Sequence, residues 1–241
     1  NDKQNKDDEL VKLSEKYENI YVLNNGINQG AGITRNRILN HTFIRGEYLY
    51  FFDCDDFLYI DNFLTCLKII MDKKYDTLYF KWERNNKINY SQKEKWNSFE
   101  VAKENIISPG IGMNPWWYIT KSSIVLNNKI RFGETQIQND VNYGVLVIHY
   151  SEKLHFEDIY VVNYNGDNLN NITNSKQDRS STIISSYNTI CELKQIESPL
   201  LKRFIHYIKY GIYPWNRQKT NNVEEYENLY NLYLSSYVDT K

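Results

Sequence analysis

A short apolar run that ends in acidic residues constrains the fold of this chain more than any other feature. Residues 48–52 read YLYFF, and residues 53–56, which follow directly, read DCDD. A continuous apolar run of this length is typical of a strand buried on both faces of a parallel sheet. In open α/β sheets, ligands bind outside the carboxyl ends of such strands. The sequence therefore predicts an α/β domain with acidic side chains at its ligand-binding edge.

Helical and strand-like segments alternate on both sides of that run. The predicted helices cover residues 8–17, 34–41, 61–72 and 139–149, and the predicted strands cover 19–23, 48–52, 76–82 and 153–164. The helix over 61–72 is expected to bury a face made of Phe63, Leu64, Leu67 and Met71. From about residue 180 the apolar spacing is helical to the end. This order predicts an α/β core in residues 1–175 and a helical region in residues 176–241.

Composition excludes several function classes. The formal net charge of −1 gives no electrostatic footprint for nucleic acid. Aromatic residues make up 15% of the chain, which suits a sugar-binding protein, although an AT-rich genome also raises the share of tyrosine and asparagine. The three cysteines are widely spaced, which favours a reducing compartment and no zinc site. With no apolar run near the ~18 residues of a membrane span and a polar start, we expect a cytoplasmic protein.

The acidic turn suggests a metal site. Asp53 and Asp55 have the spacing D-x-D at the end of the predicted strand. Mg²⁺ and Mn²⁺ prefer oxygen ligands and are usually held by one or two carboxylates together with substrate phosphates. The pair therefore indicates a site for Mn²⁺ or Mg²⁺ and a diphosphate. Acidic pairs at this position also cap the following helix, so the spacing alone does not decide between the two roles.

The stretch from residue 28 to residue 56 resembles the signature of family-2 glycosyltransferases with the GT-A fold. The matching residues are Asn28, Gly30, Gly32, Arg35, Asn36, Gly46, Glu47, Tyr48, Asp53, Asp55 and Asp56. The resemblance implies a Rossmann-like, mostly parallel sheet flanked by helices, with a helical C-terminal region added. The glycines would let the backbone approach a ligand closely.

The resemblance also implies roles for single residues at the donor end. Asp55 would hold the metal, and Asp53 would contact both the metal and the nucleotide ribose. The donor nucleotide would meet Asn28, Gly30 and Arg35, although a salt bridge is the plainer role for the arginine.

A weaker resemblance continues downstream. Residues 114–122 look like the family's tryptophan-containing acceptor segment, in which Trp116 and Trp117 are candidate platforms for an acceptor sugar; plain core packing is the alternative. Residues 130–134 look like the stretch that leads to the family's Glu-Asp pair, which here is Asn139-Asp140. The resemblance makes Asp140 the catalytic base, whereas the plain alternative is a carboxylate at a helix N-terminus.

The start of the chain departs from the family pattern. The likeness covers about residues 1–175, but roughly two strands and one helix of the nucleotide-binding half are expected ahead of the first predicted helix. The core is therefore interpreted as N-terminally incomplete. Asp2 is the candidate remnant of the family's acidic turn and is assigned to the donor nucleotide, although its neighbours do not match that turn.

The resemblance implies an inverting enzyme of bacterial surface-polysaccharide, lipooligosaccharide or capsule synthesis. It would move a sugar from a nucleoside-diphosphate sugar, with UDP expected, to a hydroxyl of a glycan or lipid-linked acceptor. The basic and aromatic C-terminal region would then touch the inner membrane face peripherally or be an ordinary solvated surface. Two other functions stay open: a nucleotide-sugar-binding or nucleotidyltransferase-like protein, and a non-catalytic carbohydrate-binding module.

Overall fold

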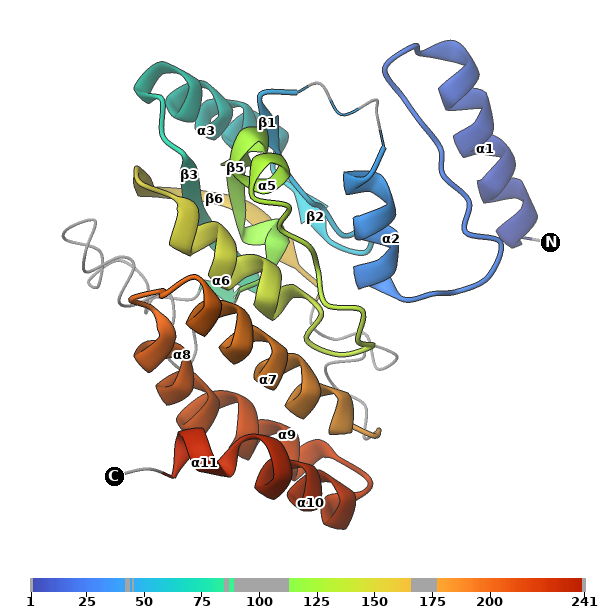
Figure 1. Ribbon diagram of the computed structural model, residues 1–241. Coiled ribbons are helices and arrows are strands. Elements are labelled where there is room, and N and C mark those ends of the chain that lie inside the picture. Colours follow the sequence, from blue (N-terminus) through green and yellow to red (C-terminus); the bar gives the residue numbers. More distant parts are fainter. Residues whose placement is uncertain are drawn as a thin grey trace.

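The computed structural model describes residues 2–41, 44, 46–84, 87–88, 113–165 and 177–239. The strands are β1 (Tyr48–Leu49), β2 (Phe57–Leu58), β3 (Thr77–Arg84), β4 (Lys87–Ile88), β5 (Tyr118–Lys121) and β6 (Leu154–Tyr164). They form one sheet in the order β1-β5-β3-β6-β2, with β4 paired to β3 (Figure 1). The helices are α1 (Asp2–Lys16), α2 (Ala31–Leu39), α3 (Ile60–Lys73), α5 (Ser122–Asn127), α6 (Asp140–Tyr150), α7 (Ser180–Gln195), α8 (Leu201–Tyr207), α9 (Tyr213–Lys219), α10 (Val223–Tyr233) and α11 (Ser235–Val238).

Strand β3 forms the centre of the core because both of its faces are covered. The hydroxyls of Thr77 and Ser151, which directly follows α6, hydrogen-bond at 2.7 Å. On the other face, the ring of Phe80 lies 6.0 Å from that of Tyr50, which in turn lies 4.8 Å from Phe63 of α3. Since side chains alternate along a strand, α6 and α3 cover opposite faces of β3. The predicted α/β class is confirmed.

The pairing of the strands differs from the expected mostly parallel sheet. Strands β3 and β6 are parallel, but each of the other pairs among the described strands is antiparallel. Only Tyr48–Leu49 of the predicted 48–52 strand pairs, with β5. The rest of the run still packs on two sides, because Tyr50 contacts Phe63 while Phe51 contacts Phe132. The two-sided packing predicted for this run is therefore present without parallel pairing.

The N-terminal elements also differ from the prediction. Helices α1 and α2 lie where helices were expected, but they begin earlier, at Asp2 and Ala31. The predicted strand over 19–23 is irregular backbone. A strand requires a hydrogen-bonded neighbour, and none of the strands in the described ranges lies beside this segment.

Helix α3 is confirmed, and Phe63 and Leu67 of the expected face pack against the core, but the other two residues do not. Leu64 and Met71 are 53% and 51% exposed, whereas Cys66 and Ile70 are fully buried. A helix that packs on a twisted sheet buries the residues nearest the strands, and periodicity alone does not fix that rotation when apolar residues lie on several sides.

The C-terminal region is helical, as predicted, and packs against the core through α6 and α7 (Figure 1). Helices α8 and α9 form one continuous run with a single π-helical turn, η3 (Ile208–Ile212), between them. Pro214 lies in the first turn of α9 and has no backbone N–H to continue the regular ladder, which accounts for the π turn. This run lies under the carboxyl edge of the sheet and contributes to the cavity described below.

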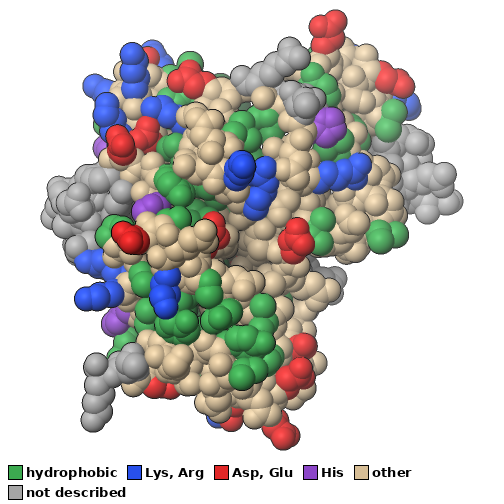
Figure 2. Space-filling view, in the orientation of Figure 1, with side chains coloured by type: hydrophobic (Ala, Val, Ile, Leu, Met, Phe, Trp, Pro, Cys, Tyr) green, Lys and Arg blue, Asp and Glu red, His purple; other side chains and the backbone are tan. Residues whose placement is uncertain are grey.

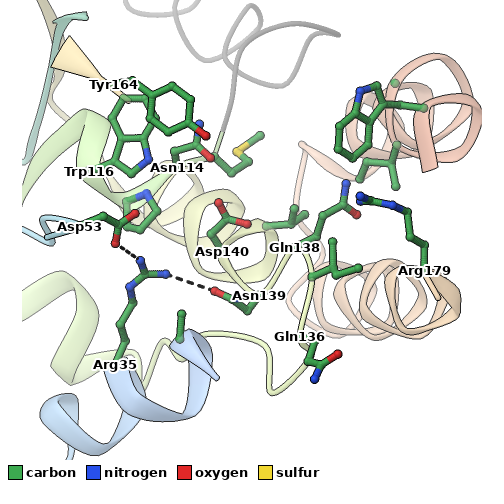
Figure 3. Close-up of a pocket in the computed structure, with 18 of the residues that line it drawn as sticks. Arg35, Asp53, Asn114, Trp116, Gln136, Gln138, Asn139, Asp140, Tyr164 and Arg179 are labelled. Carbon is green, nitrogen blue, oxygen red and sulfur yellow. Dashed lines mark hydrogen bonds and ion pairs between the residues drawn. The ribbon is translucent and has the colours of Figure 1, made fainter. Parts of the chain in front are cut away.

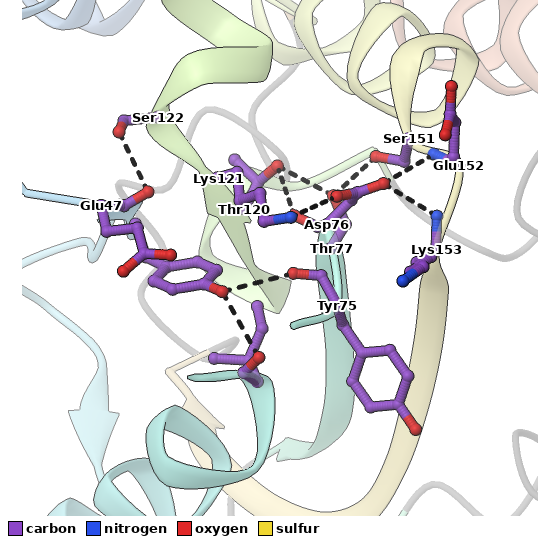
Figure 4. A network of polar contacts seen from close by, with 12 residues as sticks. Glu47, Tyr75, Asp76, Thr77, Thr120, Lys121, Ser122, Ser151, Glu152 and Lys153 are labelled. Carbon is purple, nitrogen blue, oxygen red and sulfur yellow. Dashed lines mark hydrogen bonds and ion pairs between the residues drawn. The ribbon is translucent and has the colours of Figure 1, made fainter. Parts of the chain in front are cut away.

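A polar network at the start of β3 fixes the turn between α6 and β6 (Figure 4). Asp76 accepts a hydrogen bond of 2.7 Å from Lys121 Nζ. It also accepts bonds of 2.9 Å from the backbone N–H groups of Glu152 and Lys153. Burial raises the pKa of the Asp76 carboxyl, but these hydrogen bonds outweigh it and hold the pKa below its usual range.

Asp76→Asn is expected to lower the free energy of unfolding at pH 7 by about 1–3 kcal/mol, because charge-assisted bonds are lost. A carboxyl whose folded pKa is depressed stabilises the fold above its unfolded pKa and loses that contribution as the pH falls through the folded pKa. The difference from the parent protein should therefore shrink at pH 3. Urea unfolding at both pH values measures it, with exposed Asp72→Asn as control. An equal loss at both pH values would contradict the role of the charge.

Candidate active site

A cavity of about 670 Å³ lies between the edge of the sheet and the C-terminal helices. The space-filling view shows the surface hollowed between these two parts (Figure 2). Asp53 and Asp55 line it from the turn after β1, Trp116 from the 3₁₀ turn η2 (Pro115–Trp117), and Asp140 from the first turn of α6. The structure thus brings together residues that lie up to 87 positions apart (140 − 53) in the sequence.

Arg35 of α2 joins two sides of this cavity (Figure 3). Its Nη2 forms a salt bridge and hydrogen bond with Asp53, and its Nη1 donates to Asn139 Oδ1 at 3.2 Å. The guanidinium also lies 5.3 Å from the centre of the Phe132 ring. Arg35 therefore orients the Asp53 carboxylate at the cavity wall. Asn139 occupies the position of the glutamate in the glycosyltransferase signature. Its side-chain oxygen accepts the hydrogen bond from Arg35 without adding a second negative charge.

Asp140 is half-buried at the cavity wall and follows Asn139 at the start of α6. Burial raises the pKa of its carboxyl above the ordinary value, the charge of Arg35 partly offsets that rise, and Asp53 adds to it. A carboxylate with a raised pKa takes up a proton more readily than an exposed one. The position and electrostatics of Asp140 are thus suited to proton transfer inside the cavity.

Packing and backbone conformation account for two glycines at the start of α2. A Cβ on Gly32 would lie 2.0 Å from the carbonyl oxygen of Gly133, so this helix packs on the neighbouring loop only with glycine there. Gly32 therefore has a role in close backbone packing, and its approach to a ligand stays a prediction. Gly30 has a φ of 85°, and its N–H donates to Asn28 Oδ1 at 3.0 Å. Neither Asn28 nor Gly30 lines the cavity, whereas the adjacent Ala31 does.

Both neighbouring tryptophans are buried, with Trp116 5% exposed, but only Trp116 lines the cavity. Trp116 lines the cavity and stacks on Tyr164, with ring centres 5.4 Å apart and planes 10° from parallel. Trp117 is 1% exposed, and its indole N–H donates to the carbonyl of Phe80. The prediction that Trp117 is an acceptor platform is corrected, because its ring is enclosed in the core.

The sequence also singles out Asp55, Asp56 and Asp2. Asp55 is exposed and borders the cavity. Burial and the neighbouring charges of Asp55 and Asp53 raise the pKa of Asp56 to about 6, against the opposing effect of the bond that it accepts from the Asn165 N–H. Asp2 is the first residue of α1, and its side chain lies outside the described residues.

The acidic turn can be tested as a binding site for a divalent cation. Asp53 and Asp55 offer the oxygen ligands that Mg²⁺ and Mn²⁺ prefer. The described part of the chain contains no group of three or more His, Cys, Asp or Glu side chains arranged to hold an ion. Two carboxylates fit a cation whose other ligands are substrate phosphates and waters. Since Asp53 is already paired with Arg35, Asp55 is the more available ligand.

The far wall of the cavity consists of residues that no motif in the sequence predicts. Arg179, Tyr207, Ile212 and Trp215 of the C-terminal region line it. Arg179 lies across the cavity from Asp53 (Figure 3). No local motif marks these residues. The only signal in the sequence is a cluster of basic and aromatic residues in a helical region, which on its own resembles a solvated surface.

The comparisons with known structures show the fold. The S. aureus TarS 1–349 structure in complex with UDP-GlcNAc has a TM-score of 0.70 and 16% identity, over 94% of this chain and 68% of that one. The same fragment alone gives 0.57 and 15%, over 94% and 60%, and its UDP complex gives 0.61 and 17%, over 88% and 60%. This chain thus spans 60% of the TarS 1–349 fragment solved alone. The GT-A fold is confirmed by this likeness.

Three further observations concern the sequence and the described helices. A search of curated proteins finds no match. Among the described helices, none combines the length and the apolar character that a bilayer span requires. The sequence pattern described as Glycosyl transferase family 2 matches residues 2–134, which is more than half of the chain. The chain therefore belongs to glycosyl transferase family 2.

Proposed function

We propose that this protein transfers a sugar from a nucleoside-diphosphate sugar to an acceptor hydroxyl with inversion at the anomeric carbon. The observation that carries the proposal is the placement of Asp140, Asp53 and Asp55 on one cavity. Family membership supports sugar transfer as the reaction class. A uridine nucleotide is the proposed donor, since TarS, which shares the fold, was solved with UDP-GlcNAc and with UDP.

Asp140 is proposed as the general base. Its carboxylate would accept the proton of the acceptor hydroxyl as that oxygen attacks the sugar. Half-burial keeps the carboxylate from full hydration, and the raised pKa brings its basicity closer to neutrality. A single displacement assisted by one base inverts the configuration of the transferred sugar.

Asp55, with Asp53 beside it, is proposed to hold Mn²⁺ or Mg²⁺. A bound cation supplies charge neutralisation for the leaving diphosphate. Arg35 keeps Asp53 in place and supplies a fixed positive charge at the same wall. Asn28 and Gly30 are proposed to contact the donor nucleotide at the start of α2, next to Ala31 of the cavity wall.

The acceptor is proposed to lie on Trp116. The C–H face of a sugar packs on an indole ring. Trp116 is 5% exposed and stacked on Tyr164, so the sugar would meet the part of the indole that borders the cavity. A glycan or lipid-linked acceptor of a bacterial surface-polysaccharide pathway, handled in the cytoplasm or at the inner membrane face, remains the proposed setting. Membrane contact by the C-terminal helices is part of that proposal.

Donor binding and turnover test this function. Thermal unfolding should shift upward with UDP or a UDP-sugar in Mn²⁺, because a ligand that binds only the folded state stabilises it. NMR of slowly released sugar should show the inverted anomer. Nucleotide binding with no sugar release would favour a nucleotide-sugar-binding protein instead. Glycan binding that needs neither metal nor nucleotide would favour a carbohydrate-binding module.

A further inference from the structure

A residue with a strained backbone lies on the wall of the cavity. Gln138 has a φ of 57°, in the left-handed region that residues other than glycine rarely adopt. Among the described residues, Lys74, Lys129 and Glu197 share a positive φ. Each of these three is exposed and lies within two residues of the end of a helix, where a left-handed residue ordinarily terminates the helix. Gln138 precedes a helix instead, so helix termination does not explain its conformation.

Contacts on both sides of Gln138 hold the loop in this shape. The flanking residues Ile137 and Asn139 are 5% and 8% exposed. The N–H of Gly133 donates to the carbonyl of Asn139 at 2.7 Å, and the hydroxyl of Thr135 donates to the carbonyl of Ile137 at 2.9 Å. The neighbours of Gln138 therefore fix the loop, and Gln138 adopts the left-handed conformation within that frame.

The side chain of Gln138 belongs to the cavity rather than to the packing of the loop. Gln138 is half-buried and lines the cavity between its two buried neighbours. Its backbone carbonyl accepts from the N–H of Val141 at 3.4 Å, but its side-chain amide forms no hydrogen bond within the part of the chain that the structure describes. Strained conformations persist where the surrounding structure fixes them, and they cluster at binding and catalytic sites. Since the strain gains the amide no contact within the described fold, a ligand in the cavity is the partner that remains.

The position of Gln138 indicates which ligand it meets. In Figure 3, Asp140 lies between Asp53 and Gln138. The donor diphosphate is proposed to lie at the acidic turn, next to Asp53. In a single displacement the attacking oxygen approaches the sugar from the side opposite the leaving diphosphate, so the acceptor is the substrate on the far side of the base. Trp116 lies on the other side of Asp140 in the same view, and an acceptor that contacts both Trp116 and Gln138 extends across the base.

We propose that the side-chain amide of Gln138 binds a neutral hydroxyl of the acceptor sugar and so determines part of the acceptor specificity. The proposal rests on the transferase function and adds a residue that selects the acceptor. A side-chain amide carries a hydrogen-bond donor and an acceptor without a charge, which matches the two capacities of a sugar hydroxyl. A site built to hydrogen-bond one hydroxyl rejects a sugar that lacks a hydroxyl in that place. The strained backbone of Gln138 fixes the direction of this amide.

Binding of simple sugars tests this role without requiring the true acceptor. Ligand-observed NMR titrations use the methyl glycosides of glucose, galactose and mannose, each with the full chain saturated with UDP and Mn²⁺. Galactose and mannose each differ from glucose in the direction of one hydroxyl, so the parent protein should prefer one of the three sugars. Gln138→Leu keeps the bulk of the side chain and removes the amide. It should weaken the preferred sugar by about threefold to tenfold, the loss of one neutral hydrogen bond, and should change the other two less.

A second variant, Gln138→Gly, separates the backbone strain from the binding. Glycine adopts the left-handed conformation without strain, so this variant should unfold at the same temperature as the parent protein or at a higher one. Its sugar preference should fall as in Gln138→Leu, because the amide is absent. Lys74→Gly is the matched control, since it changes an exposed left-handed residue at the end of α3 and should leave sugar binding unchanged.

The outcomes distinguish this role of Gln138 from the proposed function itself. Equal binding of the three sugars by the parent protein overturns the role, as does an unchanged preference in both variants. Loss of stability and of UDP affinity in Gln138→Gly, with the sugar preference kept, would make Gln138 a structural residue and also overturn it. If UDP binds and none of the three sugars does, the role of Gln138 fails while the transferase function stands. If UDP does not bind to the parent protein, the proposed function fails, and the role of Gln138 fails with it.

Discussion

Replacing Asp140 with asparagine is expected to slow sugar transfer by about 10²–10⁴-fold, the usual contribution of a general base. Asparagine keeps the shape of the side chain but cannot take the proton of the acceptor hydroxyl. The affinity for UDP should hardly change, because the lost interaction belongs to the transition state of transfer. Turnover measured alongside UDP binding by calorimetry separates the two quantities.

The competing role for Asp140 is structural, since it lies in the first turn of α6. There, a carboxylate gains only about 0.3–1 kcal/mol from the helix dipole, so the structural role predicts a small loss of stability and a normal rate. Glu134→Gln, at an exposed carboxylate before the same helix, serves as control. Near-normal turnover of Asp140→Asn would remove Asp140 from the chemistry.

The pH dependence provides a second measure of the same residue. The base acts only as a carboxylate, so the rate should rise with pH through the pKa of Asp140 and then level off. Because burial raises that pKa, the rise should lie above the range of an exposed aspartate. The variant should lack this limb of the profile.

The parts of the site that the sequence could predict are local. Asp53 and Asp55 follow an apolar run, and Asp140 begins an apolar-periodic helix, so each lies at the end of an element whose position the pattern indicates. Trp116 and Trp117 show the limit of such patterns. Both lie in the turn before β5, and the direction in which each ring points depends on how that turn meets β3. Spacing along the sequence does not contain that information.

The pairing of the strands and the far wall of the cavity depend on distant residues. An apolar run indicates burial, but whether it pairs parallel or antiparallel depends on its partner, and for Tyr48–Leu49 that partner is β5, about 70 residues later. Arg179 and Trp215 reach the cavity only because α7 packs on α6 and the π turn redirects the run into α9. Their role follows from tertiary packing, which no motif in the C-terminal region encodes.

Asp55→Asn is expected to abolish transfer and to weaken UDP binding in Mn²⁺. Divalent cations in such sites rely on one or two carboxylates, so the loss of one leaves the diphosphate charge without compensation. UDP binding measured in EDTA should be the same in the variant and the parent protein, because Asp55 acts only through the metal. EDTA should also stop the parent enzyme, and added Mn²⁺ should restore it.

Asp55 is a sharper probe of the metal than Asp53. The Asp53 carboxylate is bound to Arg35, so its replacement also releases a guanidinium that bridges to Asn139 and disturbs the wall itself. Asp55 is exposed, and its replacement should leave thermal unfolding unchanged in the absence of metal. Asp61→Asn, at an exposed aspartate in the first turn of α3, is the control. Full activity of Asp55→Asn, or activity that persists in EDTA, would instead leave Arg35 as the group that neutralises the diphosphate.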